Sequence, residues 1–380
     1  MEPFKNLLSR TLVEQAGRRL QSANFDGQRF AGLAAQGLEE LEMKARAMHI
    51  CAALEATLPP DFAAAADLLE AALAPPEAGE NMGQLKGIES GLRGWILWPV
   101  GEYVARHGLH QPARALSLLH AMTQRFTAEF AIRPFIVAHP GLVFETLATW
   151  CKDPSAHVRR LVSEGSRPRL PWGLQLKALI SDPSPALPLL RALQDDPSEY
   201  VRRSVANHLN DIAKDHPGLI AAWLAEHLPQ ASPQRRALLK HASRTLIKRG
   251  DPPVLRAWGL AGGLRGHATL RLDPARVSVG DVVSLTLQLQ STSPRKQRLA
   301  IDYAVHHVMA RGGTSARVFK GWLIELPPGG DLVLTRRHSM KLVTTRRYHP
   351  GRHLVTVQAN GRTVAEAAFQ LLPSPAVAVP

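Results

Sequence analysis

One eight-residue pattern occurs twice in this chain and constrains its fold more than any other feature. Residues 153–160 read DPSAHVRR and residues 196–203 read DPSEYVRR, so the two copies lie 43 positions apart. A repeat of this length in a region with helical periodicity is typical of HEAT-type units, each built from two helices. A looser third copy, SPQRRALLKHASRTLIKRG at 232–250, places its own Arg pair 33 positions after the second. The sequence therefore predicts a stack of helical repeats.

Each copy predicts the start of the second helix of its unit. Asp or Ser caps the N-terminus of a helix, and Pro is tolerated in the first turn. Val158 and Leu161 in the first copy, like Val201 and Val205 in the second, then face the neighbouring helix. Because repeated helices stack in the same orientation, the Arg pairs are expected to form a cationic strip along one concave face.

The pattern of apolar residues changes near residue 260. Up to residue 250 apolar side chains recur at three- and four-residue intervals, as in DFAAAADLLEAALA, which indicates helices. After the breaks at 251–253 and 261–266, stretches such as SVGDVVSLTLQLQST alternate apolar and polar residues between turn signals. This pattern favours an immunoglobulin-like sandwich without its disulfide, with a small barrel as the alternative. We expect a mostly α chain, with a HEAT-like repeat domain at 1–260 and an immunoglobulin-like β-sandwich domain at 266–380.

The charge of the chain is strongly basic and unevenly distributed. There are 46 Lys and Arg against 32 Asp and Glu; the net charge is −2 for residues 1–125, +7 for 126–265 and +9 for 266–380. Such a basic face favours a polyanionic partner, either nucleic acid or an anionic membrane surface. A generically basic proteome is the alternative. A membrane-surface adaptor would need Lys clustered beside an apolar edge, whereas the cations here are mostly Arg spread across the repeats.

Several classes of protein are disfavoured. Cys51 and Cys151 are too few for a disulfide framework or a zinc site. The first residues lack the apolar core of a signal peptide, and no run approaches 18 apolar residues. No phosphate-binding Gly-rich loop, nucleophile elbow or metal motif is present. We therefore expect a reduced, cytoplasmic protein that binds no metal.

The first copy places Glu164 where the second places Asn207. Arg160 and Glu164 are four residues apart and share a helix face, which Arg203, Asn207 and Asp211 continue on the other helix. One interpretation is a set of ordinary surface ion pairs. However, a carboxylate in a groove that binds a polyanion is repelled by phosphate. Stabilisation of a developing positive charge would be a reason for its presence.

Four stretches in a fixed order resemble one enzyme family. EFAIRPFI (129–136), RRLVSEGSRPRLPW (159–172), RRSVANHLNDIAKDHP (202–217) and KHASRTLIKRG (240–250) resemble the DNA alkylation repair glycosylases of the AlkC/AlkD-like superfamily. The second and third stretches are similar to the AlkC branch. TTRRYHPGRH (344–353) resembles the immunoglobulin-like domain that many members of this branch carry.

The resemblance implies a monofunctional glycosylase without cofactors. It implies excision of cationic N-methylated bases, such as N3-methyladenine, from duplex DNA without flipping the base into a deep pocket. In the AlkD branch a Trp stands four positions before the catalytic acid, and Arg160 holds that place here. We therefore expect a different contact with the lesion, and base preference cannot be copied between the branches.

The expected site follows from the resemblance and from the chemistry of a cationic leaving group. Loss of a positively charged base needs no strong acid, but a carboxylate beside the sugar stabilises the oxocarbenium-like transition state. Glu164 is the leading catalytic candidate, with Asp211 and Glu129 as companions, and Trp172 is expected to contact the sugar–phosphate near the lesion. The remaining candidates for contact with DNA are Arg133, Arg159, Arg160, Arg167, Arg169, Arg202, Arg203, Asn207, Lys240, Arg244, Lys248, Arg249, Arg346 and Arg347.

The expected partner is duplex DNA that contains alkylated bases, bound by a monomer that associates with the nucleoid and not with a membrane. Arg346 and Arg347 suit a loop that reads a narrow minor groove, with a structural turn as the alternative. The competing hypothesis for the whole chain is a non-catalytic HEAT-repeat scaffold that binds nucleic acid or protein. It accounts for the repeats and the charge but assigns no role to Glu164 and Asp211.

Overall fold

The computed structural model of the chain describes residues 3–80, 87–260, 262–343 and 347–373. It contains two compact units. The first, called unit 1 below, comprises residues Met1–Asp215 and Ala231–Ala242. The second, unit 2, comprises residues His216–Gln230 and Ser243–Pro380.

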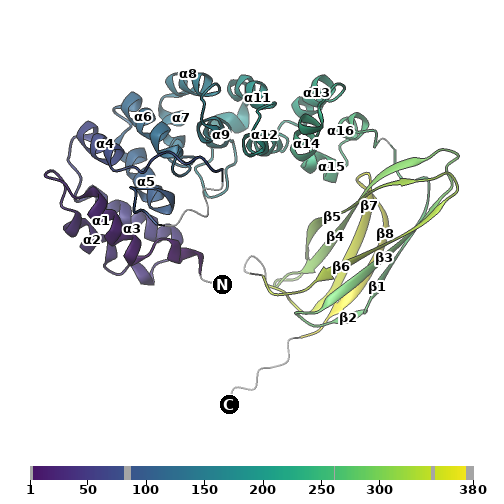
Figure 1. Ribbon diagram of the computed structural model, residues 1–380. Helices are drawn as coiled ribbons and strands as arrows, with labels where there is room; N and C mark the ends of the chain where they lie inside the picture. The colour runs from purple at the N-terminus through teal and green to yellow at the C-terminus, as the bar shows by residue number, and fades with distance from the viewer. Residues whose placement is uncertain (1–2, 81–86, 261, 344–346, 374–380) are drawn as a thin grey trace, which may run out of the picture. The chain divides into compact units, whose positions relative to one another are not determined.

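Unit 1 is built from helices in two rows (Figure 1). α3, α5, α9, α12 and α14 follow one another in one row, while α4, α6, α8 and α11 form the other. Each helix packs against neighbours that are close in the sequence, as a repeat stack requires. The described helices of unit 1 are η1 (Phe4–Leu7), α1 (Arg10–Leu20), α2 (Gly27–Ala35), η2 (Leu38–Glu40), α3 (Met43–Glu55), α4 (Phe62–Ala71), η4 (Gly94–Ile96), α5 (Leu97–His107), α6 (Pro112–Thr123), α7 (Arg133–Ala138), α8 (Pro140–Trp150), α9 (Ala156–Gly165), α10 (Lys177–Ser181), η5 (Ser184–Ala186), α11 (Leu187–Leu193), α12 (Glu199–Ile212) and α14 (Pro233–Ala242).

Residues of the repeated pattern form hydrogen bonds that cap the N-terminus of the helix that follows. In the first copy, Ser155 N–H donates to Asp153 Oδ1 at 2.8 Å, which forms a tight turn before α9. Arg159 reaches back one turn, and its Nη1 donates to the carbonyls of Asp153 at 2.7 Å and Pro154 at 2.9 Å. Its Nε donates to Asp196 Oδ2 at 2.6 Å, which ties the first copy to the second.

The second copy repeats these contacts before α12. Ser198 N–H donates to Asp196 Oδ1 at 2.9 Å, and Arg202 Nη1 donates to the carbonyls of Asp196 and Pro197. In both copies Ser is the N-cap residue and Pro precedes it, so the predicted position of Pro inside the first turn is wrong. The first Arg of each pair therefore has a structural role and does not form part of a cationic strip.

The apolar positions of the repeat pack between α9 and α12 as predicted. Val158, Leu161, Val201 and Val205 are each fully buried, and the two helices pack along their length. Val158 and Val201 occupy the same place of the 43-residue repeat, and Val205 corresponds to the buried Val162, so both copies contribute to the interface.

A histidine lies in the same interface. His208 on α12 is fully buried, and its Nδ1 donates to the Ser163 carbonyl at 2.9 Å. Its Nε2 has no hydrogen-bond partner among the described residues. Burial lowers the pKa of His208 to about 4, because a charged imidazolium would be poorly solvated there. The side chain is therefore neutral near pH 7.

Unit 2 contains a β-sandwich (Figure 1). One sheet has the strand order β1-β3-β6 and the other β2-β8-β7-β4-β5, and all described pairs are antiparallel except β2 with β8. Alternate residues of both sheets, such as Leu285, Leu287, Val305 and Val355, form a common core. Two separate sheets establish the sandwich over the barrel. The strands are β1 (Gly266–Asp273), β2 (Arg276–Val277), β3 (Val282–Ser291), β4 (Gln297–Val308), β5 (Thr314–Leu326), β6 (Asp331–Ser339), β7 (Gly351–Ala359) and β8 (Arg362–Leu371).

Three helices belong to unit 2 together with the strands. These are α13 (Pro217–His227), α15 (Arg244–Arg249) and α16 (Pro252–Ala257). Gly250, with φ of 73°, ends α15 against Gly361 in the β7–β8 turn, where φ is 76°. A Cβ atom at Gly361 would lie 2.0 Å from the Gly250 Cα, so only glycine permits this approach. The division into domains at 260–266 follows the change from helix to strand and stays a prediction.

We predict that Arg159→Met lowers the free energy of unfolding by about 2–4 kcal/mol, because it leaves buried Asp196 and two carbonyls without their donor. Urea denaturation followed by circular dichroism measures this change. Arg203→Met is the matched control, since Arg203 makes an exposed pair with Glu199 and should change stability by less than about 0.5 kcal/mol. Equal losses in the two variants would contradict the structural role of Arg159.

A second prediction concerns acid stability. The pKa of His208 is about 4 in the fold and about 6.5 in the unfolded chain, so the unfolded chain binds more protons between these values. The resulting stabilisation is complete above about pH 6.5 and is lost as the pH falls toward 4. We expect His208→Gln to reduce the loss of unfolding free energy between about pH 7 and pH 4.5 by about 2 kcal/mol. His110→Gln, at an exposed position, is the control, and an identical pH dependence in both variants would refute the prediction.

Candidate active site

Two carboxylates on neighbouring helices share one arginine. Glu164 lies in the last turn of α9 and Asp211 in the last turn of α12. Arg167, just after α9, donates from Nη1 to Glu164 Oε1 at 2.5 Å and from Nε to Asp211 Oδ2 at 2.8 Å. Ser204 Oγ donates to Glu164 Oε2 at 2.6 Å, and Lys214 Nζ donates to Asp211 Oδ1 at 2.7 Å. Each carboxylate oxygen therefore accepts a hydrogen bond.

Arg160 extends this network to the third predicted carboxylate. Its Nη1 lies 2.9 Å from Glu129 Oε2 and donates to Thr127 Oγ1 at 3.1 Å. The Thr127 hydroxyl donates in turn to Glu129 Oε2 at 2.7 Å, and the guanidinium lies over the Tyr200 ring at 4.9 Å. The contact of Arg160 Nη2 with Glu164 Oε1 is looser, at 3.8 Å. The structure thus brings the three predicted catalytic carboxylates into one cluster.

The cluster is almost closed to solvent. Glu164 is 5% exposed and Asp211 is 2% exposed. Burial by itself raises the pKa of Glu164, but the charges of Arg160 and Arg167 and the Ser204 hydrogen bond outweigh it and hold that pKa below its ordinary value. The same carboxylates raise the pKa of Arg160 and of Arg167 against the effect of burial. Glu164 is therefore ionised at neutral pH and suits charge stabilisation better than proton donation.

Trp172 presents an open aromatic surface on the loop that follows Arg167. Its side chain is 70% exposed, although it stacks on Trp98 with ring centroids 6.5 Å apart and planes at 15°. The ring centroids of Trp98 and Phe130 are 5.7 Å apart, so the exposed indole rests on the buried Trp98 and the half-buried Phe130 behind it. The backbone of Trp172 has φ of 66°, in the left-handed region that a bulky residue rarely adopts. An exposed, strained aromatic residue beside a charged cluster is typical of a ligand contact.

Four of the predicted DNA contacts are engaged inside the protein. Arg133 is fully buried and donates to two backbone carbonyls, so its guanidinium does not lie at the surface, and its contact with phosphate stays a prediction. Arg159 binds Asp196 and the carbonyls before α9, and its phosphate contact likewise stays a prediction. Arg160 and Arg167 direct their donors to carboxylates. All four arginines therefore bind carbonyls or carboxylates of the protein in this structure, although the sequence suggested phosphate as their partner.

The predicted contacts that remain accessible in unit 1 lie on or near α12 and α14. The Arg203 side chain is 64% exposed. The Arg169 side chain is 31% exposed and donates two hydrogen bonds of 2.9 Å to the Asp215 carboxylate. Asn207 Oδ1 is 2.8 Å from His241 Nε2 across the α12–α14 interface. A groove of about 410 Å³ runs between these helices and is lined by Arg203 and His241 among others. Lys240 is partly buried on α14.

The other predicted cations belong to unit 2. Arg244 and Lys248 are partly buried on α15 and Arg249 is exposed there, while Arg347 is exposed before β7. Arg346 lies outside the described residues. Whether these side chains touch DNA stays a prediction.

Sequence reasoning missed the residues that complete the cluster. Ser204 occupies the position of Leu161 in the 43-residue repeat, so a polar residue on an otherwise apolar face was the available signal. Tyr200 and Thr127 also contact Arg160, and Lys214 contacts Asp211, but single surface-type residues of this kind carry no signal in one sequence.

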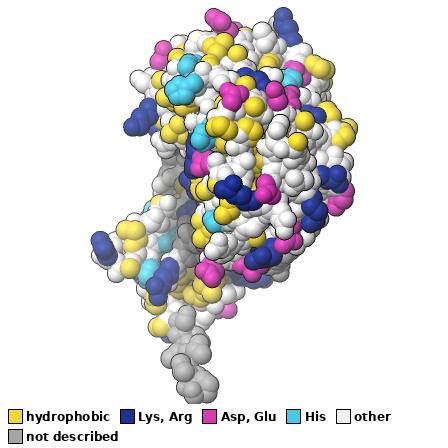
Figure 2. Space-filling model, turned by 90° about the vertical axis from the view of Figure 1, so that its left-hand side faces the viewer, with side chains coloured by type: hydrophobic (Ala, Val, Ile, Leu, Met, Phe, Trp, Pro, Cys, Tyr) yellow, Lys and Arg dark blue, Asp and Glu magenta, His cyan; other side chains and the backbone are white. Residues whose placement is uncertain are grey.

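Surface charge, metal ligands and apolar helices point to no further site in the described residues. Figure 2 shows acidic and basic side chains interspersed over the face of the molecule that carries the N-terminal helices, in line with the small net charge of residues 1–125. Among the described residues, no three His, Cys, Asp or Glu side chains are grouped to hold a metal ion. Within the same residues, no helix combines the length and apolarity needed to cross a bilayer.

Comparisons with known proteins cover 98% of the chain. A family model described as the C-terminal immunoglobulin-like domain of uncharacterised protein YhaZ matches residues 266–373. The uncharacterized protein YhaZ of Bacillus subtilis is 35% identical over 98% of this chain and all of its own length. The alkylpurine DNA glycosylase AlkC of Pseudomonas fluorescens, solved bound to DNA with an abasic site analog, is 32% identical with a TM-score of 0.86, and the match covers 98% of this chain and 100% of that one. The chain belongs to the AlkC family of alkylpurine DNA glycosylases, in the branch with a C-terminal immunoglobulin-like domain.

Proposed function

We propose that the protein is a monofunctional DNA glycosylase that excises cationic N-methylated bases, N3-methyladenine and related lesions, from duplex DNA. Two observations support this proposal. The solved relative of the same family is an alkylpurine DNA glycosylase bound to DNA. The single feature that carries the proposal in this chain is Glu164, a carboxylate kept ionised among arginines on an otherwise basic protein.

The chemistry of the lesion explains why such a carboxylate suffices. A base methylated at N3 is positively charged, so the bond from C1′ of the sugar to the base breaks with both electrons moving to the base, which leaves neutral. The sugar then carries the positive charge as an oxocarbenium ion. A fixed carboxylate stabilises this charge in the transition state more than in the ground state. Water attacks C1′ and loses its proton to the carboxylate or to solvent, so no cofactor is needed.

The roles of the neighbouring groups follow from their contacts. Arg167 orients Glu164 and Asp211 before DNA binds, so the reaction does not wait for their reorganisation. Arg160 is the replaceable partner of Glu164, because their 3.8 Å contact is the weakest in the cluster. We propose that a DNA phosphate draws Arg160 aside and uncovers the carboxylate. Asp211 and Glu129 partly offset the positive charges of Arg160, Arg167 and Lys214.

Trp172 and the accessible cations supply the DNA contacts in this proposal. The open indole face can pack on the sugar and bases next to the lesion, since aromatic surfaces stack on nucleotides without sequence preference. Arg203, Arg169 and Lys240 in unit 1 and the cations of unit 2 bind phosphates. The cluster is lined with charge and holds no deep aromatic cage, which favours excision without base flipping. We further propose that the protein acts as a monomer on cytoplasmic, nucleoid-associated DNA.

We predict that Glu164→Gln lowers the single-turnover rate of base release from duplex DNA containing N3-methyladenine by about 10²–10³-fold. Gln keeps the shape and the Ser204 hydrogen bond, so the dissociation constant for DNA should stay within about threefold of the original. Free base is measured by chromatography at saturating protein.

Glu145→Gln on α8 is the matched control, because Glu145 is exposed and outside the cluster, and its rate should not change. Because the pKa of Glu164 lies below its ordinary value, the original protein should keep a constant rate from about pH 8 down to about pH 5. Full activity of Glu164→Gln would remove Glu164 from the mechanism. Tight DNA binding without any base release by the original protein would favour the non-catalytic scaffold.

A further inference from the structure

Arg133 is the most deeply buried charged residue near the cluster. Its side chain is fully buried at the start of α7. Nε donates to the Leu174 carbonyl at 2.5 Å, and Nη1 donates to the Gly165 carbonyl at 2.8 Å. Gly165 is the last residue of α9, directly after Glu164, and Leu174 lies two residues after Trp172. One guanidinium therefore joins the helix of the candidate catalytic carboxylate to the loop of the exposed tryptophan.

The loop needs such a contact because its conformation is strained. Trp172 has φ of 66°, a conformation that costs about 1–3 kcal/mol for a residue of this kind and persists only where the surroundings hold it. The neighbouring Gly173 packs closely over Arg133 and Phe130, since a Cβ atom there would lie 3.4 Å from Arg133 Cδ and 3.3 Å from Phe130 Cδ1. Arg133 thus contacts the loop directly after the strained position, through Cδ at Gly173 and through Nε at Leu174.

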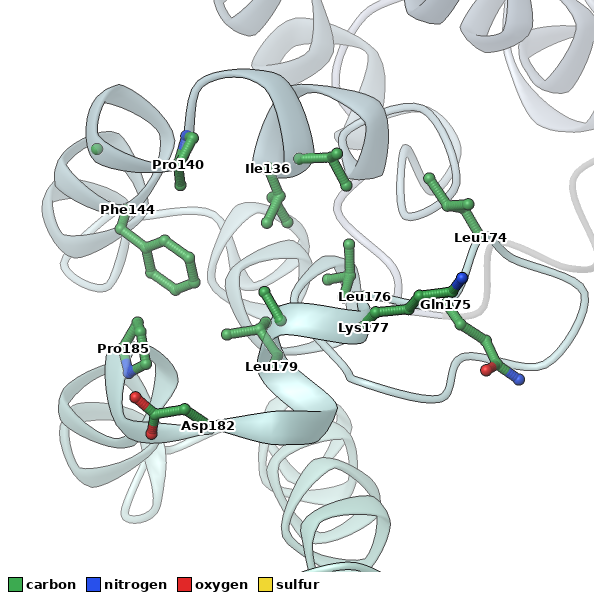
Figure 3. A pocket seen from close by; sticks show the side chains of 13 residues that line it. Ile136, Pro140, Phe144, Leu174, Gln175, Leu176, Lys177, Leu179, Asp182 and Pro185 are labelled. Carbon is green, nitrogen blue, oxygen red and sulfur yellow. The ribbon is translucent and has the colours of Figure 1, made fainter.

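Packing on the opposite side of the loop is incomplete. Leu174 and Leu176 line a pocket of about 650 Å³, together with Ile136 from α7 and Phe144 from α8 (Figure 3). Figure 3 shows these apolar side chains facing one another across open space, with Leu174 at the edge. Side chains that border a cavity lose dispersion contacts on that side. The polar anchors of the loop after Trp172 therefore gain importance, and they include Arg133 and the hydrogen bonds from Gly173 N–H to the Leu170 carbonyl and from Leu176 N–H to the Pro168 carbonyl.

Filling space in the core does not explain why an arginine stands at position 133. Burial, followed by the nearby charge of Arg167, lowers the pKa of Arg133 to about 10, so the side chain is charged at neutral pH at a cost in solvation. Its Nη2 has no hydrogen-bond partner among the described residues. An apolar side chain of similar volume would avoid both costs but could not hold two carbonyls at once.

We propose that Arg133 is a positioning residue that fixes Trp172 relative to Glu164. This proposal rests on the proposed function for its effect on catalysis, whereas the placement of Trp172 can be measured without DNA. Arg133→Met removes both donors and keeps most of the volume. Arg133→Lys keeps the charge and can reach one of the two carbonyls.

Arg46 provides a matched control. It is also a buried arginine, 3% exposed, whose guanidinium donates to backbone carbonyls, those of Leu41, Lys5, Leu8 and Glu39. Arg46→Met should destabilise the protein without affecting the loop, because those carbonyls lie in the N-terminal helices.

The full-length protein labelled with 5-fluorotryptophan is examined by ¹⁹F NMR, and the resonance of Trp172 is identified by its loss in Trp172→Phe. We expect the Trp172 resonance to shift or broaden in Arg133→Met, to change less in Arg133→Lys, and to stay unchanged in Arg46→Met. An unchanged Trp172 resonance in folded Arg133→Met would overturn the proposal. If Arg133→Met does not fold, Arg133→Lys decides by the same criterion.

Kinetics supplies the second measurement. Base release at saturating protein should fall on the order of 10- to 100-fold in Arg133→Met, because a small misplacement of a positioned group has this effect. The dissociation constant for DNA should rise only a few-fold, and Arg46→Met should keep the original rate below its unfolding transition. A displaced Trp172 resonance with an unchanged rate would refute the catalytic part of the proposal. Absence of base release in the original protein would refute the proposed function and leave the NMR result to decide the role of Arg133.

Discussion

The contact of Arg167 with both Glu164 and Asp211 is the interaction on which the site depends, because it joins the ends of α9 and α12 at their most buried charges. Removing one member of such a buried group leaves the others uncompensated and typically costs about 3–5 kcal/mol. Together with the charge of Arg160 and the Ser204 hydrogen bond, the same contact holds the pKa of Glu164 below its ordinary value. The guanidinium of Arg167 therefore links the packing of α9 on α12 to the chemistry of the site.

The sequence predicted the fold well because fold depends on patterns that recur. The 43-residue repeat, the helical spacing and the later change to alternation each involve many residues, and the buried faces of α9 and α12 followed directly from them. The three carboxylates could be named from the family resemblance and from the four-residue spacing of Arg160 and Glu164. Their convergence across α9, α12 and the segment before α7 required the structure.

The arginines were harder to assign, because one side chain can bind a phosphate, a carboxylate or a carbonyl with the same five donors. Arg159 and Arg202 recur because each donates to carbonyls just before the N-terminus of its helix. Periodicity alone could not distinguish this role from a repeated DNA-binding surface. Arg133 likewise donates to two carbonyls, which periodicity could not indicate. Ser204 was missed because its role depends on one hydrogen bond to Glu164, 40 positions earlier. Trp98 was missed because it stacks on Trp172, 74 positions later.

The central claim is that a fixed carboxylate acts on a leaving group that is already cationic, with no general acid. The most direct test compares base release from two duplexes that differ only in the lesion, one with N3-methyladenine and one with its neutral isostere in which carbon replaces N3. We expect release of the cationic base at saturating protein, and release of the isostere slower by several orders of magnitude, because no group in the cluster can protonate it. Comparable rates for the two bases would contradict the account and require a proton donor.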